Sequence, residues 1–200
     1  MSNYIFAPSP PLDAENNVFV TWENGFSAEE LDRISAYCDE NLELSEATIG
    51  LGANSGSAPD WRKSRTGWLE NNRDVGWFYD RMAFIARKLN SHFYRFDLYG
   101  FVEPMQYTVY GNGEDHYDWH IDSGRSDVSP RKLSMSLLLS DPKDYQGGDL
   151  EFMSGKNVDR AKKDRGTVVA FPAYRLHRVS PVTKGVRKSI VVWTTGPQFR

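Results

Sequence analysis

Three residues that commonly bind metals stand out by their spacing. His120 and Asp122 are separated by one residue, and His177 follows 55 residues after Asp122. Side chains alternate between the two faces of an extended strand, so a His-x-Asp pair points to one side. Two histidines and one carboxylate on one face of an octahedral metal leave three positions open, and this facial triad is typical of non-haem Fe(II) oxygenases.

A fourth residue extends this pattern. Arg187 lies ten residues after His177, within Gly185–Ser189. A guanidinium group can donate two parallel hydrogen bonds to a carboxylate. A metal triad combined with a carboxylate clamp at this spacing indicates an iron enzyme that uses 2-oxoglutarate. A histidine taken alone is more often a surface residue or a satisfied core residue, so the prediction depends on the combination.

The remaining histidines and the cysteine have structural interpretations. His116 precedes His120 by four residues in a glycine-containing turn, and we expect a surface or supporting role for it rather than ligation. His92 comes at the end of a predicted helix, where a cation suits the helix dipole. Cys38 is expected in the core, on the apolar face of an earlier helix.

The first half of the chain predicts helices and a few outer strands. Ser27 and Glu30 have the spacing of a capping box, which begins a helix in which Leu31, Ile34 and Cys38 share one face. A second helix spans about residues 73–92, with an apolar stripe that faces the core. Its members are Phe78, Met82, Ile85, Leu89 and Phe93. Strands are expected at 17–22, 46–50 and 65–69.

After residue 95 the pattern changes to short strands separated by turns. They are predicted at 100–110, 117–122, 132–139, 149–152, 167–171, 176–179 and 187–193. Regularly spaced short strands indicate a barrel or a double-sheet sandwich. The predicted fold is therefore mainly β with supporting α-helices, a jelly-roll-like barrel. A single domain over 1–200 would comprise helical support and outer strands over about 1–95 and the barrel over about 96–200.

Composition narrows the range of partners. The 200 residues are 40% hydrophobic and 26% charged, and the formal net charge of −3 gives no general attraction to nucleic acid or to an anionic membrane. We see no signal peptide and no long apolar span. The single cysteine suits a reducing compartment, so a cytoplasmic protein is expected.

The chain resembles a known family over about residues 95–197. The supporting motifs are Gly147-Gly148, Phe171-Pro172, the His177-x-Val-x-Pro-Val run and Arg187. This combination is similar to Fe(II)/2-oxoglutarate-dependent dioxygenases of the prolyl 4-hydroxylase-like branch, which includes bacterial PKHD-type hydroxylases. The resemblance implies a double-stranded β-helix (jelly-roll/cupin-like) barrel.

The resemblance also implies roles for individual residues. His120, Asp122 and His177 would be the iron ligands. Arg187 would pair with the C5 carboxylate of 2-oxoglutarate, with Ser189 adding a hydroxyl. Tyr110 and Tyr117 match aromatic positions that line the co-substrate pocket.

The chain departs from the family pattern at one pocket position. Some members have a tyrosine on the third core strand that also donates to the co-substrate, but the matching residue here is Leu138. Tyr107 or Tyr110 are candidates for the missing donor. Many collagen-type enzymes have lysine where this chain has Arg187, and arginine is the form found in other members.

The function that the resemblance implies is hydroxylation of a prolyl or other residue in a protein or peptide. Fe(II), 2-oxoglutarate and O2 would be required, with ascorbate as a candidate reductant, and succinate and CO2 would be released. The alternatives are hydroxylation of a small molecule such as a free amino acid, and a catalytically silent binding module of the same fold. Demethylation of nucleic acid is disfavoured, because the second arginine of that branch is replaced by Trp193.

The surroundings of the site offer further candidates. Trp61, Trp68 and Trp119 are candidates for a substrate groove, although Trp119 would point away from His120 in a regular strand. The small-residue stretch 50–60 is interpreted either as a lid over the site or as a plain linker. Two basic clusters are expected to be solvated, with guidance of an acidic protein substrate as the alternative. They are Arg62, Lys63 and Arg65, and Lys162, Lys163 and Arg165.

Overall fold

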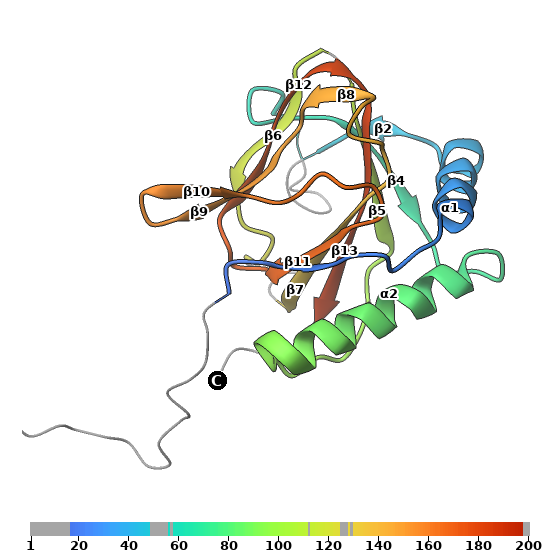
Figure 1. Ribbon diagram of the computed structural model, residues 1–200, viewed down its shortest axis with the longest axis vertical. Coiled ribbons are helices and arrows are strands. Elements are labelled where there is room, and N and C mark those ends of the chain that lie inside the picture. The colour runs from blue at the N-terminus through green and yellow to red at the C-terminus, as the bar shows by residue number, and fades with distance from the viewer. Residues whose placement is uncertain are drawn as a thin grey trace, which may run out of the picture.

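The computed structural model describes residues 17–48, 56, 58–111, 113–124, 128 and 130–197. Its strands form two antiparallel sheets, with the helices along one side (Figure 1). Strand predominates over helix, and the predicted jelly-roll-like fold is confirmed. Residues 1–16 and most of the 50–60 stretch lie outside the described residues, so the lid prediction is not addressed.

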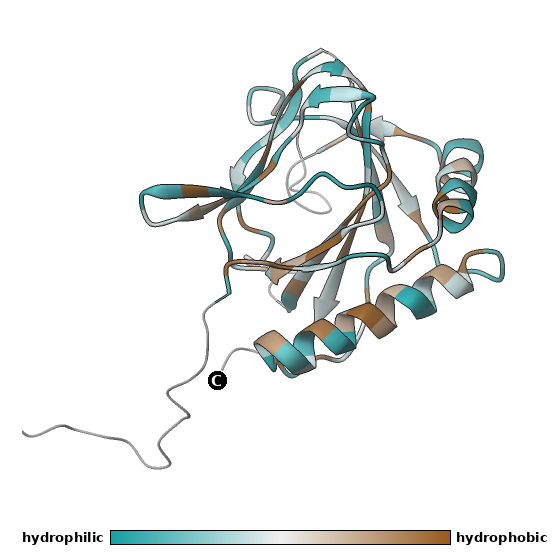
Figure 2. Cartoon of the chain, viewed as in Figure 1, coloured by the Kyte–Doolittle hydropathy of each residue, from teal (hydrophilic) through white to brown (hydrophobic). Residues whose placement is uncertain are grey.

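The larger sheet has seven strands. In spatial order they are β1 (Val20–Trp22), β11 (Val168–Pro172), β7 (Arg131–Leu138), β13 (Arg187–Thr195), β5 (Met105–Tyr110), β4 (Arg65–Leu69) and β2 (Ser45–Glu46). The central strands carry side chains buried on both faces. In Figure 2, apolar residues concentrate on central strands such as β7 and β11.

The smaller sheet has six strands and a more polar outer face. Its members are β10 (Asn157–Arg160), β9 (Leu150–Ser154), β12 (His177–Gly185), β6 (Asp115–His120) and β3 (Arg62–Lys63), with β8 (Tyr145–Gly147) paired to β12. A compact apolar cluster that includes Tyr110, Leu138, Phe152 and Phe171 fills the space between the two sheets.

Helix α1 (Ala28–Asn41) begins at the predicted capping box. The Ser27 hydroxyl accepts a hydrogen bond from the Glu30 backbone N–H at 3.2 Å, and the Glu30 carboxylate accepts one from the Ser27 N–H at 2.9 Å. Leu31, Ile34 and Cys38 are buried, as the helical spacing predicts. These residues join the main core between the helices and the larger sheet.

Helix α2 (Gly76–Leu89) runs along the same side of the larger sheet (Figure 1). Four members of its predicted stripe are buried, from Phe78 to Leu89, but Phe93 is 38% exposed. The reason is the π-helical turn η2 (Asn90–Tyr94), whose wider hydrogen-bonding pattern shifts the phase of the residues that follow. Neither helix of the described chain is long and apolar enough to cross a membrane.

Candidate metal centre and co-substrate pocket

The three predicted ligands come together where two neighbouring strands meet. His120 ends β6, His177 begins β12, and the two residues are directly paired across the strands. Asp122 lies two residues beyond the end of β6, and its backbone N–H donates to the Ala173 carbonyl at 2.8 Å. Pairing of β6 with β12 therefore brings ligands together that are far apart in the sequence.

The ligand atoms face one another at close range. Asp122 lies between the histidines: its Oδ1 is 3.7 Å from His120 Nε2, and its Oδ2 is 3.7 Å from His177 Nε2. All three ligand atoms lie within 4.8 Å of one another, and all three residues are buried. This donor set suits Fe(II), because it has two imidazoles and one hard carboxylate.

Both imidazoles are fixed in the protonation form that a metal requires. His120 Nδ1 lies 2.7 Å from the Asp118 carbonyl oxygen, and His177 Nδ1 lies 2.8 Å from the Arg175 carbonyl oxygen. A carbonyl oxygen only accepts, so each Nδ1 carries the proton and donates it. Each Nε2 is then left with a lone pair that points into the site.

The charge states of the ligands also suit a cation. Burial, followed by the neighbouring His177, lowers the pKa of His120 to about 3, so this imidazole is neutral at physiological pH. Burial alone would raise the pKa of Asp122, but the histidines, the Ser134 hydroxyl and Arg131 outweigh it and lower the pKa. Ser134 Oγ donates to Asp122 Oδ2 at 2.6 Å.

An irregularity in β6 places Tyr117 beside the metal site. His120 pairs with His177, and Tyr117 pairs with Val179, so β6 has one more residue than β12 between these two pairs. Such a β-bulge brings residues three apart onto the same face. The Tyr117 ring stacks on the His120 imidazole, with centroids 3.4 Å apart, and Tyr117 thereby lies next to this candidate ligand.

Arg187 lies at the start of β13, inside the barrel. Its side chain is buried, and its Nη1 donates to the Ser189 hydroxyl at 3.0 Å, which places Ser189 next to it as predicted. The guanidinium carbon lies 5.4 Å from the centre of the Tyr110 ring. Burial raises the pKa of Tyr110, so its hydroxyl stays protonated. Within the described residues, Arg187 forms no ion pair with a carboxylate.

The double glycine makes room for the arginine. Gly147 and Gly148 both have positive φ, at 75° and 63°. A Cβ on Gly148 would lie 2.8 Å from Arg187 Cδ and 2.9 Å from Val182 Cγ2. The Gly147-Gly148 pair is therefore required by both backbone conformation and close packing.

The prediction that Tyr107 supplies the missing donor does not agree with its position. Tyr107 is fully buried on the opposite face of β5 from Tyr110, in the core under the helices. Its hydroxyl donates to Asp39 at 2.7 Å. Residues three apart in a regular strand point to opposite faces, so Tyr107 and Tyr110 cannot both face the pocket. Leu138 does face the pocket, opposite Ser189.

Several residues at the site were not among the predicted ones. Ser134 supports Asp122, Tyr145 of β8 borders the arginine, and Arg62 of β3 lies 4.5 Å from the centre of the Tyr117 ring and donates to Gln106 at 2.8 Å. Tyr145 stands two residues before the double glycine, which is a signal that could have identified it. Arg62 was assigned to a solvated cluster because the two-residue strand β3 has no recognisable pattern.

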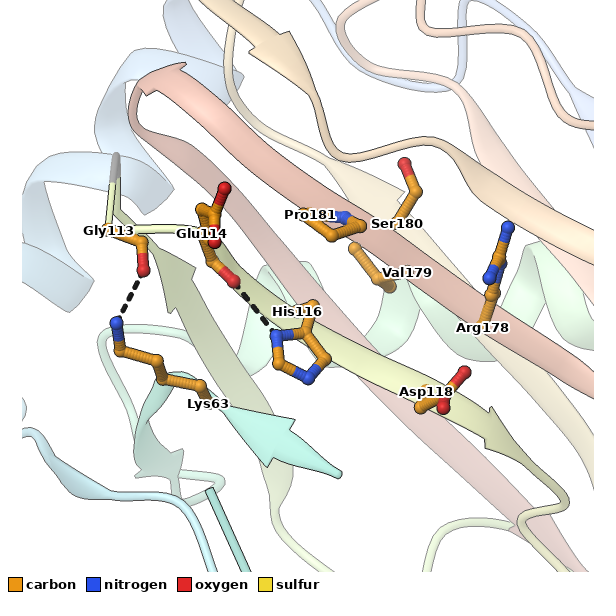
Figure 3. A pocket seen from close by; sticks show the side chains of 9 residues that line it. All are labelled: Lys63, Gly113, Glu114, His116, Asp118, Arg178, Val179, Ser180 and Pro181. Carbon is orange, nitrogen blue, oxygen red and sulfur yellow. Dashed lines mark hydrogen bonds between the residues drawn. The ribbon is translucent and has the colours of Figure 1, made fainter. Parts of the chain in front are cut away.

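His116 lies apart from the metal centre, on the outer side of β6. Figure 3 shows it in a polar cleft between β6 and β12, with Lys63 and Arg178 nearby. Its Nδ1 is 2.8 Å from the Glu114 carbonyl oxygen, and its Nε2 is 3.3 Å from that of Asp60. Both ring nitrogens thus face backbone carbonyls rather than the metal centre, which agrees with a surface role.

The tryptophans and Cys38 divide between the site and its surroundings. Trp119 lies on the outer layer under the Arg178 guanidinium, as expected from its position next to His120. Trp61 is 40% exposed and packs edge-on against Tyr117. Trp68 packs against Trp193 in the larger sheet. Cys38 is buried in the main core, as predicted.

Comparison with known proteins gives matches for this region. Residues 105–195 match the family model described as the 2OG-Fe(II) oxygenase superfamily. A PKHD-type hydroxylase of Teredinibacter turnerae is 37% identical over 98 residues, which cover 46% of this chain and 42% of that protein. The chain therefore spans less than half the length of this curated relative.

Solved structures match the fold over most of the chain. A Trichoplax adhaerens prolyl hydroxylase in complex with a hypoxia inducible factor peptide fragment superposes with a TM-score of 0.72 at 15% identity, covering 90% of this chain and 84% of the other. A Pseudomonas putida prolyl-4-hydroxylase gives a TM-score of 0.69 at 19% identity, covering 91% and 94%. At these identities the likeness concerns the fold.

Proposed function

We propose that the chain is an iron- and 2-oxoglutarate-dependent hydroxylase, because residues 105–195 match the family model of the 2OG-Fe(II) oxygenase superfamily and carry the predicted motifs. One observation carries the proposal. Two imidazoles and one carboxylate converge in the same barrel as a buried arginine that has no carboxylate partner among the described residues. The first group fits a divalent cation, and the second fits the carboxylate of an oxo-acid.

His120, Asp122 and His177 would hold Fe(II) through Nε2, a carboxylate oxygen and Nε2. When bound, the iron supplies the chemistry by which O2 converts 2-oxoglutarate to succinate and CO2 and delivers one oxygen atom to the substrate as a hydroxyl group. Together the three side chains would supply three donor atoms, so the remaining coordination positions would be left to 2-oxoglutarate and O2. Ser134 keeps the carboxylate oriented, and Tyr117 holds the His120 ring in place.

Arg187 would bind and orient the co-substrate. Its buried guanidinium can donate two hydrogen bonds to the C5 carboxylate, in a site from which water is excluded. The Ser189 hydroxyl already accepts a hydrogen bond from Arg187 Nη1, which fixes the orientation of the guanidinium group. The face of the Tyr110 ring forms one wall of this pocket.

For the substrate, we propose a prolyl residue within a protein or peptide. An aromatic path leads to the metal ligands: exposed Trp61 packs against Tyr117, and Tyr117 stacks on His120. The flat faces of such rings suit a proline side chain in an extended peptide. The prolyl hydroxylases among the structural matches support this choice. The single buried cysteine suits a cytoplasmic location.

The first test is an anaerobic absorption spectrum of the protein with Fe(II), before and after addition of 2-oxoglutarate. A new visible charge-transfer band is expected from chelation of the oxo-acid at the iron. If iron is bound and no band develops, the site is a metal centre of another kind and the proposal fails. Succinate formation, measured with ascorbate present and with proline-containing peptides, then tests the substrate class.

The role of Arg187 is tested by the substitution Arg187→Ala. Loss of a charge-assisted, two-pronged contact should raise the 2-oxoglutarate concentration needed for half-maximal succinate formation by about 10- to 100-fold. Iron binding should not change, because the arginine does not contact the metal ligands. An unchanged 2-oxoglutarate requirement would place the carboxylate clamp elsewhere.

A further inference from the structure

A small cavity between the two sheets contains two buried polar atoms without a hydrogen-bond partner among the described residues. They are Arg187 Nε and the Tyr145 hydroxyl. Both residues line the cavity, together with Leu138 and Gly148. A buried donor without a partner costs free energy, so two such donors in one cavity indicate a missing ligand that accepts hydrogen bonds.

The charge of the cavity defines the class of this ligand. Arg187 is 4% exposed, and the described residues provide no carboxylate to pair with it. The other two cations that line the cavity are already paired. Lys163 Nζ lies 2.8 Å from Asp149 Oδ1 and donates to the Gly147 carbonyl at 2.6 Å, and Lys162 Nζ lies 3.0 Å from Glu23 Oε1. One uncompensated positive charge remains, and it suits one carboxylate.

Tyr145 reaches the cavity from β8, on the side opposite the larger sheet. Gly148 borders both its ring and the arginine, because a Cβ there would be 3.3 Å from Tyr145 Cε2 and 2.8 Å from Arg187 Cδ. Tyr145 is 4% exposed, and its hydroxyl oxygen is buried. Burial raises the pKa of this phenol more than the adjacent Arg187 guanidinium lowers it, so the hydroxyl keeps its proton at neutral pH and acts as a donor.

The other tyrosines of the region are not equivalent candidates. The hydroxyl of Tyr107 is engaged by Asp39 on the far side of the sheet. Arg187 lies over the ring of Tyr110, which thus offers its face to the guanidinium. Leu138 lines the cavity but has no polar atom.

We propose that Tyr145 is a co-substrate-binding residue, whose hydroxyl donates to the same distal carboxylate of 2-oxoglutarate that Arg187 binds. This assignment rests on the proposed function and specifies which side chain completes its pocket. It also accounts for the leucine at position 138, since the hydroxyl arrives from β8 and not from β7. The pocket then distinguishes an oxo-acid with a second carboxylate from one without it.

The test is an anaerobic calorimetric titration of 2-oxoglutarate into the Fe(II)-loaded full chain, comparing the wild type with Tyr145→Phe. This change removes one oxygen atom and keeps the ring. Loss of a hydrogen bond to a charged group should weaken 2-oxoglutarate binding by about 10- to 100-fold. Tyr107→Phe is the matched control, a buried strand tyrosine of the opposite face, and it should bind 2-oxoglutarate like the wild type.

A second ligand separates the hydroxyl contact from a general effect on packing. 2-Oxovalerate has the same five-carbon chain but lacks the distal carboxylate, so wild type and Tyr145→Phe should bind it equally. The assignment is overturned if Tyr145→Phe binds 2-oxoglutarate as tightly as the wild type, or if both oxo-acids are weakened equally. If the iron-loaded wild type binds no 2-oxoglutarate, the proposed function falls, and this assignment falls with it.

Discussion

At the scale of single residues, Ser134 is the support on which the carboxylate ligand depends. It is fully buried on β7, and its hydroxyl donates to Asp122 Oδ2 at 2.6 Å. The other oxygen of the same carboxylate is the one nearer to His120. Ser134 therefore fixes the rotation of the carboxylate between the two imidazoles without itself binding the metal.

We predict that Ser134→Ala weakens Fe(II) binding by about 10-fold or more, as is usual for groups that orient metal ligands. Ser134→Thr keeps the hydroxyl and should retain most of the affinity. Competition with a coloured chelator measures both variants. Equal iron affinity in Ser134→Ala and the wild type would show that the carboxylate is oriented by the backbone alone.

The residues at the site differ in how far the sequence could reveal them. The ligands and Arg187 followed from residue type and spacing. Tyr107 was a wrong candidate, although alternation along β5 separates it from Tyr110. For Tyr145 the sequence offers only its position two residues before the double glycine, and its role depends on the chain folding back there against β12.

At the scale of elements, both helices and most strands were predictable, and three short strands were not. The capping box of α1 and the run 65–69 correspond directly to observed elements. Strands β3, β8 and β10 have two to four residues, too few for a pattern of alternation to be recognised. The bulge in β6 could not be foreseen either, because it arises from pairing with β12.

The turn that precedes β9 gives a prediction about the arginine pocket. Gly148→Ala should weaken 2-oxoglutarate binding, because the new methyl group must displace Arg187 or Val182 in addition to adopting a positive φ. Gly155→Ala is the matched control: its φ is also 63°, but no atom lies within 4 Å of the added Cβ. Calorimetry should show weaker binding for the first variant only; equal losses would mean that backbone strain alone matters.

The packing of α1 gives a prediction about its cysteine. Cys38 is fully buried, and burial raises the pKa of its thiol to about 12. The reactive thiolate is therefore scarce in the folded protein even at pH 9. We expect a thiol reagent such as Ellman's reagent to modify Cys38 only as the protein unfolds in guanidinium chloride. Rapid modification of the native protein would show that α1 detaches readily from the core.

At the scale of the whole molecule, metal binding and folding are coupled. The ligands come from two strands that pair across more than fifty residues of sequence, so the unfolded chain has no equivalent site. A cation that binds only the folded state, at 100 times its dissociation constant, stabilises it by about 2.7 kcal/mol. For a chain of this size, that corresponds to a rise in melting temperature of roughly 5–10 °C.

We therefore expect anaerobic Fe(II) to raise the melting temperature of the wild type, as measured by circular dichroism. Asp122→Ala should lose this shift, since it removes the only anionic ligand, and it should also lose turnover. Asp159→Ala, an exposed aspartate on β10, should behave like the wild type. A full thermal shift in Asp122→Ala would contradict the ligand assignment.

The overall architecture was predictable because many short strands with regular turns are compatible with few folds. The order of the strands within each sheet was not, because it depends on pairings between distant segments. β13, for example, lies between β5 and β7, and β12 lies between β9 and β6. The geometry of the metal site, like the strand order, could not be predicted from the sequence, because the direct pairing of His120 with His177 is a property of the assembled sheet.

The way in which the two imidazoles are held has a consequence for mutational tolerance. Each Nδ1 donates to the carbonyl of the residue two positions earlier in its own strand segment, at Asp118 and Arg175. A carbonyl group is present whatever side chain that residue carries, so no single substitution at these supporting positions deletes the acceptor. Main-chain geometry keeps the proton on Nδ1. The side chains at these supporting positions can therefore be substituted without a change of imidazole tautomer.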